Sequence, residues 1–543
     1  MRKIRYLILV VLAIQFVGCS EDYLELVPKG APSSATFWAN DNDAVLGTNS
    51  IYSQLYQEEM YGRGYFWLIN ASDDMIDGRN KGVAGELKNF TSDGNVGYIN
   101  NSWRDHWKTI KICNDVIRNI KRMDEEGLIS AAVRDDCLGQ AYFVSAWMYV
   151  ELAYHYGDYS GYSYCLKSDA EDQGIPILNE EDPVDYFRPR EDNVQINYDY
   201  ALDLLDKAIP LLPYVTDMSS EDIGRAHKDA ANAYKAKIYI YSEKWNEAIA
   251  ACDAVINSPS GRALIDTDTP EEDYHSVFKI ENNVSSEYVW SIVSNELQGS
   301  MLPGVTLENK GWGRYNGWGY FQPVKELDDA FEAGDYRRKA TVYTHGDTIR
   351  NFFGEDFGWW QTNNSLTGYA TSKYYDPYQN ESPIGNTINT SGDYVTTDLW
   401  IPLLRFAELI LWKAEAKLML GQNADAEINM IRDRAGLAPK SGATMADLKH
   451  ERRCEFGMEF ADRHFDLVRW GDAEAAYAQP LHGTQGTYED DGNGNMVLVS
   501  TEVTEVWPGR TYNPMYHNVW PLPPNEIEKS IGTEGELKQN LGW

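Results

Sequence analysis

Basic residues are scarce in this sequence of 543 residues, and their scarcity excludes one class of partner. Only 48 lysines and arginines stand against 83 aspartates and glutamates, so the formal net charge is -35. A surface with this balance repels nucleic acid and anionic lipid headgroups, because both carry charge of the same sign. The composition therefore predicts no nucleic-acid partner.

Cysteine and histidine are also rare, with 6 and 9 residues. Five of the cysteines are scattered without CxxC spacing, which favours neither a disulfide framework nor a zinc site, and they fit small core residues. The sequence contains no glycine-rich phosphate loop and no nucleophile elbow. We therefore predict no cofactor, no metal ion and no catalytic residue. The five scattered cysteines are Cys113, Cys137, Cys165, Cys252 and Cys454.

Long apolar runs are missing after the first part of the chain. The chain starts MRKIRYLILVVLAIQFVGCSED, in which basic residues precede an apolar run at residues 6–17. That run is shorter than the roughly 20 apolar residues that span a bilayer, and its arrangement is typical of an export signal. Its end, Val-Gly-Cys, resembles a bacterial lipobox, in which Cys19 is acylated and becomes the mature N-terminus. We interpret residues 1–18 as a lipoprotein signal peptide; an ordinary secretory peptide cleaved after Gly18 is the alternative.

Helical patterning is abundant in the rest of the sequence. Residues 228–259 predict two helices joined by a turn at residues 242–244. Ala236, Tyr239 and Ala248 have the spacing of the small, aromatic and small positions of a tetratricopeptide repeat. The sequence therefore predicts an all-α fold, a right-handed superhelix of tetratricopeptide-like helix pairs. Further helical patterns lie at residues 110–123, 140–158, 194–205 and 405–421, the last followed by a second helix through residue 431.

The span from about residue 260 to residue 398 has a different composition. It is rich in glycine and aromatic residues, as in GWGRYNGWGYF at residues 311–321, and this predicts long loops with short strands. An indole stacks well on the apolar face of a pyranose ring, while neighbouring polar groups bind its hydroxyls. The cluster therefore predicts a glycan-binding surface, although core packing explains each residue alone equally well. The candidates are Trp312, Trp318, Tyr320, Trp359 and Trp360.

A longer motif follows at residues 450–471, HERRCEFGMEFADRHFDLVRWG. It resembles the ER-x-x-E-x-x-x-E-x-x-R-x-x-D-L-x-R-W-G signature of SusD-like (RagB/SusD) nutrient-uptake lipoproteins. Supporting similarities are the FW-x-N start at residues 37–40 and PLPPNEI at residues 521–527, while Leu541 stands where the family usually has proline. The matching positions are Glu451, Arg452, Glu455, Glu459, Arg463, Asp466, Leu467, Arg469, Trp470 and Gly471.

This resemblance implies a function and a domain plan. It implies a lipid-anchored protein on the surface of the outer membrane that captures a glycan and passes it to a SusC-like TonB-dependent transporter. It also implies one SusD-like domain at residues 19–543. We expect that domain to have an N-terminal part at about 30–260, a loop-rich insertion at about 260–398 and a C-terminal part at about 399–543.

The segment INASDDMIDGRN is where this family usually begins its ligand site. We expect Asp73 and Asp74 to accept hydrogen bonds from sugar hydroxyls and Arg79 to donate to others. A solvated turn held by aspartate side chains is the alternative for this segment. Tyr98 completes the predicted glycan-binding set.

Two clusters of acidic residues could also be interpreted as a catalytic site or a metal site. Glu455, Glu459 and Arg463 have the spacing of one helix face, where a buried ionic network is a better explanation than a catalytic carboxylate pair. Residues 491–502 have carboxylates and amides at positions of a calcium loop, but Met496 replaces the required glycine, so a hairpin turn is favoured. A secreted helical glycoside hydrolase and a ligand-free tetratricopeptide-type scaffold are the alternative functions.

Overall fold

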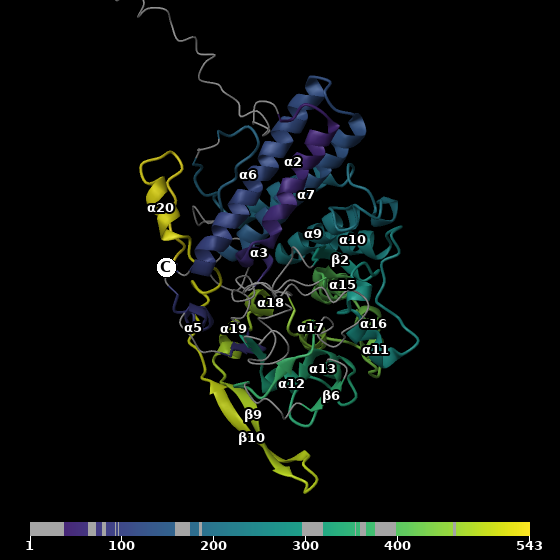
Figure 1. Ribbon diagram of the computed structural model, residues 1–543. Coiled ribbons are helices and arrows are strands. Elements are labelled where there is room, and N and C mark those ends of the chain that lie inside the picture. Colours follow the sequence, from purple (N-terminus) through teal and green to yellow (C-terminus); the bar gives the residue numbers. More distant parts are fainter. Residues whose placement is uncertain are drawn as a thin grey trace, which may run out of the picture.

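The longest helices form the upper part of the molecule, and the lower part contains shorter helices and short strands (Figure 1). The structure is a computed structural model, and it describes residues 37–62, 72–78, 83–92, 94–95, 97–157, 174–183, 187–295, 319–352, 355–358, 365–374, 398–459 and 463–543. Among the helices in these ranges, none has the length and apolar character needed to cross a membrane.

The long helices pack in chain order, each against the next. Helix α6 contacts α7, α7 contacts α8, and the series continues through α9 and α10. Helix α10 then packs directly against α15, so the helical stack continues across the whole loop-rich insertion. The predicted all-α scaffold of tetratricopeptide-like pairs is confirmed. These helices are α2 (Asp41–Ser53), α6 (Gly97–Glu125), α7 (Ala131–Tyr156), α8 (Val194–Ala208), α9 (Lys228–Tyr241), α10 (Trp245–Ile256), α15 (Phe406–Met419), α16 (Asp425–Arg434) and α17 (Met445–Phe456).

The pair α9–α10 matches its sequence prediction closely. The connection occupies residues 242–244, where Glu243 has a φ of 54° and Lys244 N–H donates to the carbonyl of Tyr239 at 2.9 Å. Ala236 and Ala248 are fully buried. Their small side chains allow the two antiparallel helices to approach each other closely, which is why this pattern identifies the pair.

Helix α7 ends at Tyr156, and Gly157 follows it for a steric reason. The glycine has a φ of -71°, so it does not adopt a left-handed conformation. A Cβ atom there would lie 2.5 Å from the carbonyl oxygen of Ala153 and 2.7 Å from Cγ2 of Val194. Glycine is therefore required because α8 begins against the end of α7. Helix α6 extends well beyond its predicted residues, 110–123, because a polar stretch of 13 residues precedes the periodic part.

Five two-stranded antiparallel sheets occur among the described residues, and none of them joins another. Four of them have at least one strand within residues 260–398, which confirms the prediction of short strands there. The paired strands are β1 (Met75–Asp77) with β3 (Phe321–Pro323), β2 (Tyr288–Ile292) with β8 (Ile401–Arg405), β4 (Val342–Tyr343) with β7 (Ala370–Thr371), β5 (Thr348–Phe352) with β6 (Glu355–Gly358), and β9 (Leu481–Asp490) with β10 (Met496–Trp507). The shorter helices are η2 (Gln54–Tyr56), α3 (Glu58–Tyr61), α5 (Val83–Lys88), η3 (Val215–Asp217), α11 (Pro270–Ser276), η4 (Ile280–Asn282), α12 (Lys325–Asp328), α13 (Arg337–Thr341), α18 (Arg463–Arg469), α19 (Ala473–Tyr477) and α20 (Pro524–Ser530).

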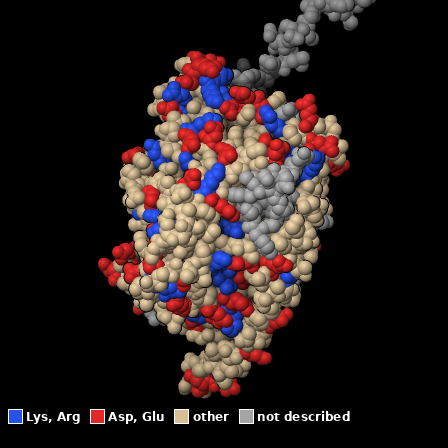
Figure 2. All heavy atoms as spheres, turned by 180° about the vertical axis from the view of Figure 1, so that it is seen from behind, with Lys and Arg blue, Asp and Glu red and all other residues tan. Residues whose placement is uncertain are grey.

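The hairpin β9–β10 projects from the lower end of the molecule (Figure 1). Its turn is held by Asp491, whose Oδ1 accepts hydrogen bonds from the N–H groups of Asn493 at 2.8 Å and Asn495 at 3.2 Å. Glu502 lies in β10 opposite Gln485, away from that turn. The preference for a hairpin over a calcium loop is confirmed. Acidic side chains gather at this lower tip (Figure 2).

The signature motif does not form one helix, so the prediction of a single helix face was wrong. Helix α17 ends at Phe456, Gly457 turns the backbone to a ψ of 131°, and Met458 has a φ of 65°. Arg463 lies in a separate helix, α18. The helical spacing of the charged residues therefore did not imply a common face, because α17 ends between Glu455 and Glu459.

Of the scattered cysteines, four are described. Cys113, Cys137, Cys252 and Cys454 are buried and have free thiols, as predicted for core residues. Cys165 and the proposed lipidation residue Cys19 lie outside the described residues.

Candidate ligand-binding site

Buried ion pairs connect the signature motif to the strands of the insertion. At the end of β8, Arg405 lies 2.6 Å from a carboxylate oxygen of Glu287, 3.0 Å from Glu455 and 2.8 Å from Glu459. Burial alone would raise the pKa of Glu455, but Arg434 and Arg405 lower it to about 2. Glu455 and Glu459 therefore belong to a buried ionic network, as predicted, and hold the insertion against α17.

Arg463 binds a different partner from the one its spacing indicated. Its Nε and Nη2 atoms donate to the two carboxylate oxygens of Asp73, at 2.8 and 2.9 Å. Arg453 Nε donates to Asp74 at 2.7 Å. Burial would raise the pKa of Asp73, but Arg463 and Arg453 hold it well below its usual range. The signature motif thus supplies two arginines that hold the Asp73–Asp74 pair.

Two further basic side chains hold the backbone of the same segment. Lys88 Nζ donates to the carbonyl oxygens of Ser72 at 3.0 Å and Met75 at 2.7 Å. Arg510 donates to the Ser72 carbonyl at 3.1 Å. Burial, followed by the nearby Arg510 charge, lowers the pKa of Lys88 well below its usual value. Four basic residues therefore fix residues 72–75, which lead into β1.

Strand β1 pairs with β3 and joins two segments that are about 240 residues apart in the chain. Met75 lies opposite Pro323 and Asp77 opposite Phe321, and Gly78 N–H donates to the carbonyl of Tyr320 at 2.8 Å. A Cβ atom on Gly78 would lie 2.3 Å from the carbonyl oxygen of Gly319. Glycine is required at residue 78 because the two backbones approach so closely.

One buried amide joins a third segment to these two. Gln322 Nε2 donates to the carbonyl of Gly319 at 3.2 Å. Its Oε1 accepts from the N–H of Leu366 at 2.8 Å and from the hydroxyl of Ser365 at 3.1 Å. Residues near positions 78, 319 and 365, which are far apart in the sequence, therefore meet at one side chain. We call this arrangement the Gln322 junction.

Most of the predicted glycan-binding residues lie next to this junction in the sequence. Tyr320 is half-buried there, with its ring centroid 6.3 Å from that of Phe321. Arg79 follows Gly78 directly, Trp318 precedes Gly319 directly, and the third segment, before Ser365, carries two more predicted tryptophans. Arg79, Trp312, Trp318, Trp359 and Trp360 themselves lie outside the described residues.

The remaining predicted residues lie in well-packed surroundings. Asp73 and Asp74 are 8% and 2% exposed, and each is paired with an arginine. Their contact with sugar hydroxyls stays a prediction. Tyr98 is half-buried near the start of α6, where it packs against the core.

Sequence reasoning missed the residues that build the junction and those that hold residues 72–75. Gln322 binds the N–H of Leu366, 44 positions away, while Lys88 and Arg510 bind the carbonyl of Ser72, 16 and 438 positions away. No spacing rule connects them, because each contact depends on the tertiary fold. The one available signal was local: Gln322 lies within an apolar stretch directly after the glycine- and tryptophan-rich segment.

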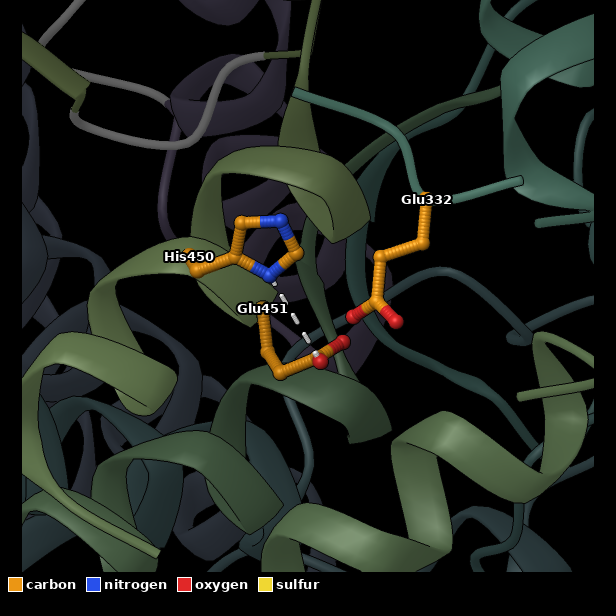
Figure 3. Close-up of side chains that lie close together, drawn as sticks. All are labelled: Glu332, His450 and Glu451. Carbon is orange, nitrogen blue, oxygen red and sulfur yellow. Dashed lines mark ion pairs between the residues drawn. The ribbon is translucent and has the colours of Figure 1, made fainter. Parts of the chain in front are cut away.

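Three titratable side chains among the described residues lie close enough together to suggest a cation site. Glu332, His450 and Glu451 have ligand atoms within 4.8 Å of one another, and Figure 3 shows His450 Nδ1 facing the Glu451 carboxylate. Arg432 already lies 2.6 Å from Glu332 and 2.5 Å from Glu451. Hydrogen bonding to Cys454 and to Glu451 raises the pKa of His450 to about 10. The carboxylates are therefore neutralised by an arginine and a protonated histidine, and the group does not fit a metal ion.

Comparison with known proteins places the whole arrangement in one family. A model described as "SusD family" matches residues 282–543, and one described as "Starch-binding associating with outer membrane" matches residues 36–240. A curated SusD-like protein of Bacteroides ovatus is 24% identical over 498 residues, which cover 86% of this chain and 82% of the relative.

Solved structures share the fold. A SusD-like protein of Bacteroides fragilis matches with a TM-score of 0.73 at 24% identity, and the match covers 94% of this chain and 99% of the other. Surface glycan-binding protein A of Bacteroides thetaiotaomicron, in complex with laminarihexaose, matches with a TM-score of 0.67 at 19% identity over 92% and 99% of the two chains. The signature motif, the helical stack and these matches agree, and the chain belongs to the SusD-like family.

Proposed function

We propose that the protein binds a glycan without altering it, at a surface carried by the segments that leave the Gln322 junction. The observation that carries this proposal is the junction itself. It brings together the described ends of three segments that separately contain the predicted stacking and hydrogen-bonding residues. A polar amide buried at 3% exposure is a rigid foundation for such a site, because its contacts fix the loop ends before ligand binds.

The relatives support this kind of ligand. One family model is described as starch-binding, and a solved protein with the same fold holds laminarihexaose. Both ligands are neutral glucans. Indole rings that stack on pyranose faces, together with polar groups at their edges, suit that chemistry.

We also propose that the protein is anchored to the outer membrane through acylated Cys19 and delivers its glycan to a SusC-like TonB-dependent transporter. The basis is the lipobox-like Val-Gly-Cys and the family description, which includes association with the outer membrane. A Cys19→Ala variant should move from the membrane to the soluble fraction in cells that lack the transporter. If it fractionates as the parent does, the anchor is not at Cys19.

The glycan proposal is tested by a glycan array followed by calorimetry on the purified protein. Trp312→Ala and Trp318→Ala should each lose about 1–3 kcal/mol of affinity for the best array ligand, through loss of stacked area. Their melting temperatures should change little, as is usual for exposed loop side chains. Trp245→Ala, on the distant helix α10, is the control and should keep full affinity.

Two results would contradict the proposal. Unchanged affinity in both loop variants would place the site elsewhere, and a large loss of stability would place these residues in the core. A reducing-sugar assay separates binding from hydrolysis, because a binding protein releases no new reducing ends. An array without any ligand would favour the scaffold alternative.

A further inference from the structure

A groove lies between α6 and residues 176–183 and 187–188, and Glu526 of α20 also lines it. We call it the α6 groove. Figure 1 shows where α6 and α20 lie in the molecule. The volume of the groove is about 390 Å³, within the range of small-molecule sites. It shares no residue with the Gln322 junction. The residues that carry the argument are Trp103, Trp107, Lys108, Lys111, Leu178 and Phe187.

One side of the groove is a single stripe of α6. Arg104, Trp107, Lys108, Lys111 and Arg118 follow one another at helical spacing, so they share one face of the helix. Helix α6 carries six basic residues against four acidic ones, in a chain with a net charge of -35. The groove is therefore locally basic on an acidic protein.

The opposite side is fixed to the helix before any ligand binds. The Leu178 carbonyl accepts hydrogen bonds from Asn114 at 3.1 Å and from the Tyr149 hydroxyl at 2.7 Å. Arg118 donates to the Glu180 carbonyl at 2.7 Å. With these carbonyls already engaged, the side offers no strand edge to a peptide. The groove suits a compact ligand that is held by side chains.

Trp107 is a partly buried aromatic side chain that lines this groove. Its ring lies against that of Trp103, with centroids 5.6 Å apart, and meets the edge of Tyr149 at 6.0 Å. Phe187 lines the groove from the other side. A ring held in this way loses little freedom on binding, which favours stacking of a sugar ring.

Most charges of the groove neutralise one another. Arg118 pairs with Asp115 at 2.6 Å, Arg188 with Asp182 at 2.5 Å, Arg104 with Asp105 at 2.8 Å, and Glu526 with Lys529 at 2.7 Å. Lys108 and Lys111 are exposed and have no ion pair with any described residue. Two uncompensated ammonium groups therefore stand beside the Trp107 ring.

We propose that the α6 groove is a second saccharide site, selective for sugars that carry carboxylate or sulfate groups. Trp107 stacks on the sugar ring while Lys108 and Lys111 bind the anionic substituents. Uronates and sulfate esters share this chemistry, and nucleic acids are disfavoured by the charge of the whole chain. This site goes beyond the proposed neutral-glycan site and does not require it.

The test is calorimetry with acidic oligosaccharides, each paired with a neutral twin. Trigalacturonate is compared with its methyl ester, and a panel of sulfated oligosaccharides with their desulfated forms. The intact protein should bind at least one acidic member, more tightly than its twin, and more weakly at 500 mM than at 50 mM salt because salt screens exposed charges. The carboxylate and sulfate arms identify which substituent is preferred.

Substitutions in the α6 groove test whether the acidic saccharides bind there. Lys108→Ala/Lys111→Ala should weaken binding about tenfold, which is the effect of two exposed charge contacts. Trp107→Ala should weaken it about tenfold or more through lost stacking. Because that variant removes a packed ring, Lys108→Glu/Lys111→Glu gives an independent test that leaves the core intact. The matched control is Lys207→Ala/Lys244→Ala, two lysines outside the groove.

Other results of these experiments would contradict the proposal that acidic saccharides bind in the α6 groove. Absence of binding by every acidic probe, equal binding of the neutral twins, or competition by inorganic sulfate at the same ionic strength would each do so. Acidic glycans that bind normally to the lysine variants but not to Trp312→Ala would be bound at the loop site. That result would overturn this proposal and leave the proposed function standing.

Discussion

The helical stack and the region around the signature motif are both buried, but different forces hold them together. In the stack, the interior is mainly aromatic and aliphatic: Trp147 is fully buried and meets Trp290 of β2 edge to face at 5.5 Å. Around the signature, the interior contains guanidinium groups and carboxylates, such as Arg405 and Glu455. Apolar packing tolerates substitution of similar volume, whereas a buried charge requires a partner at one particular position. The second region should therefore be the more fragile.

The largest expected loss of stability follows a substitution in the buried ionic network around the signature motif, which we call the ionic region. Arg405→Met removes the partner shared by Glu287, Glu455 and Glu459. Leaving buried carboxylates short of a partner should reduce the free energy of unfolding by about 3–5 kcal/mol. Urea unfolding followed by tryptophan fluorescence measures this loss.

The control for this variant is an exposed ion pair. Lys207→Ala breaks the pair with Asp203, in which both side chains are at least half exposed, and should change stability by less than about 0.5 kcal/mol. If Arg405→Met were no more damaging than Lys207→Ala, the network would be incidental to the fold, and the contrast between the two regions would disappear.

Acid should weaken the ionic region selectively. Arg434 and Arg405 overcome the effect of burial and lower the pKa of Glu455 from 4.5 to about 2. Between these values the unfolded chain binds more protons than the folded protein, so stability falls as pH drops from 4.5 towards 2 and is fully present above 4.5. A shift of this size corresponds to about 3 kcal/mol.

Chemical unfolding at pH 5 and pH 3 measures this dependence. A Glu455→Gln variant cannot titrate at this position, so its stability should change less between the two pH values than that of the parent protein. An equal change in both proteins would assign the acid sensitivity to other carboxylates.

The contrast also explains which parts of the molecule could be predicted from sequence. The pair α9–α10 depends on local periodicity, and it was predicted. The partners of Arg463 could not be predicted, because Asp73 lies 390 residues away and the turn at Gly457 changes the direction of the chain. The Gln322 junction was unpredictable for the same reason.

The stability of the helical stack should depend on the volume of the side chains that are buried between its helices. Ala236 is fully buried where α9 approaches its neighbours. Ala236→Leu inserts three carbon atoms into a closely packed interface and should cost about 1–3 kcal/mol. Urea unfolding of this variant next to Ala236→Gly separates overpacking from helix propensity, because glycine costs only about 1 kcal/mol in a helix. A leucine variant as stable as the parent would mean that the helices are less tightly packed than their buried alanines indicate.

The smallest expected effect comes from a local feature within the ionic region. Helix α17 begins with a capping box: Thr444 accepts from the N–H of Asp447, and the Asp447 carboxylate accepts from the Thr444 N–H at 2.9 Å. Thr444→Ala should cost about 1 kcal/mol, as at other helix N-termini. Thr444→Ser keeps the hydroxyl and should restore most of the loss. The cap lies on the same helix as Glu455 but depends only on residues three positions apart, so its effect should add to that of Arg405→Met. In the double variant, the loss of unfolding free energy should equal the sum of the two single losses to within about 0.5 kcal/mol. A larger departure would show that the cap and the network are coupled. The signature region would then unfold as one unit, in which even local contacts depend on the buried charges.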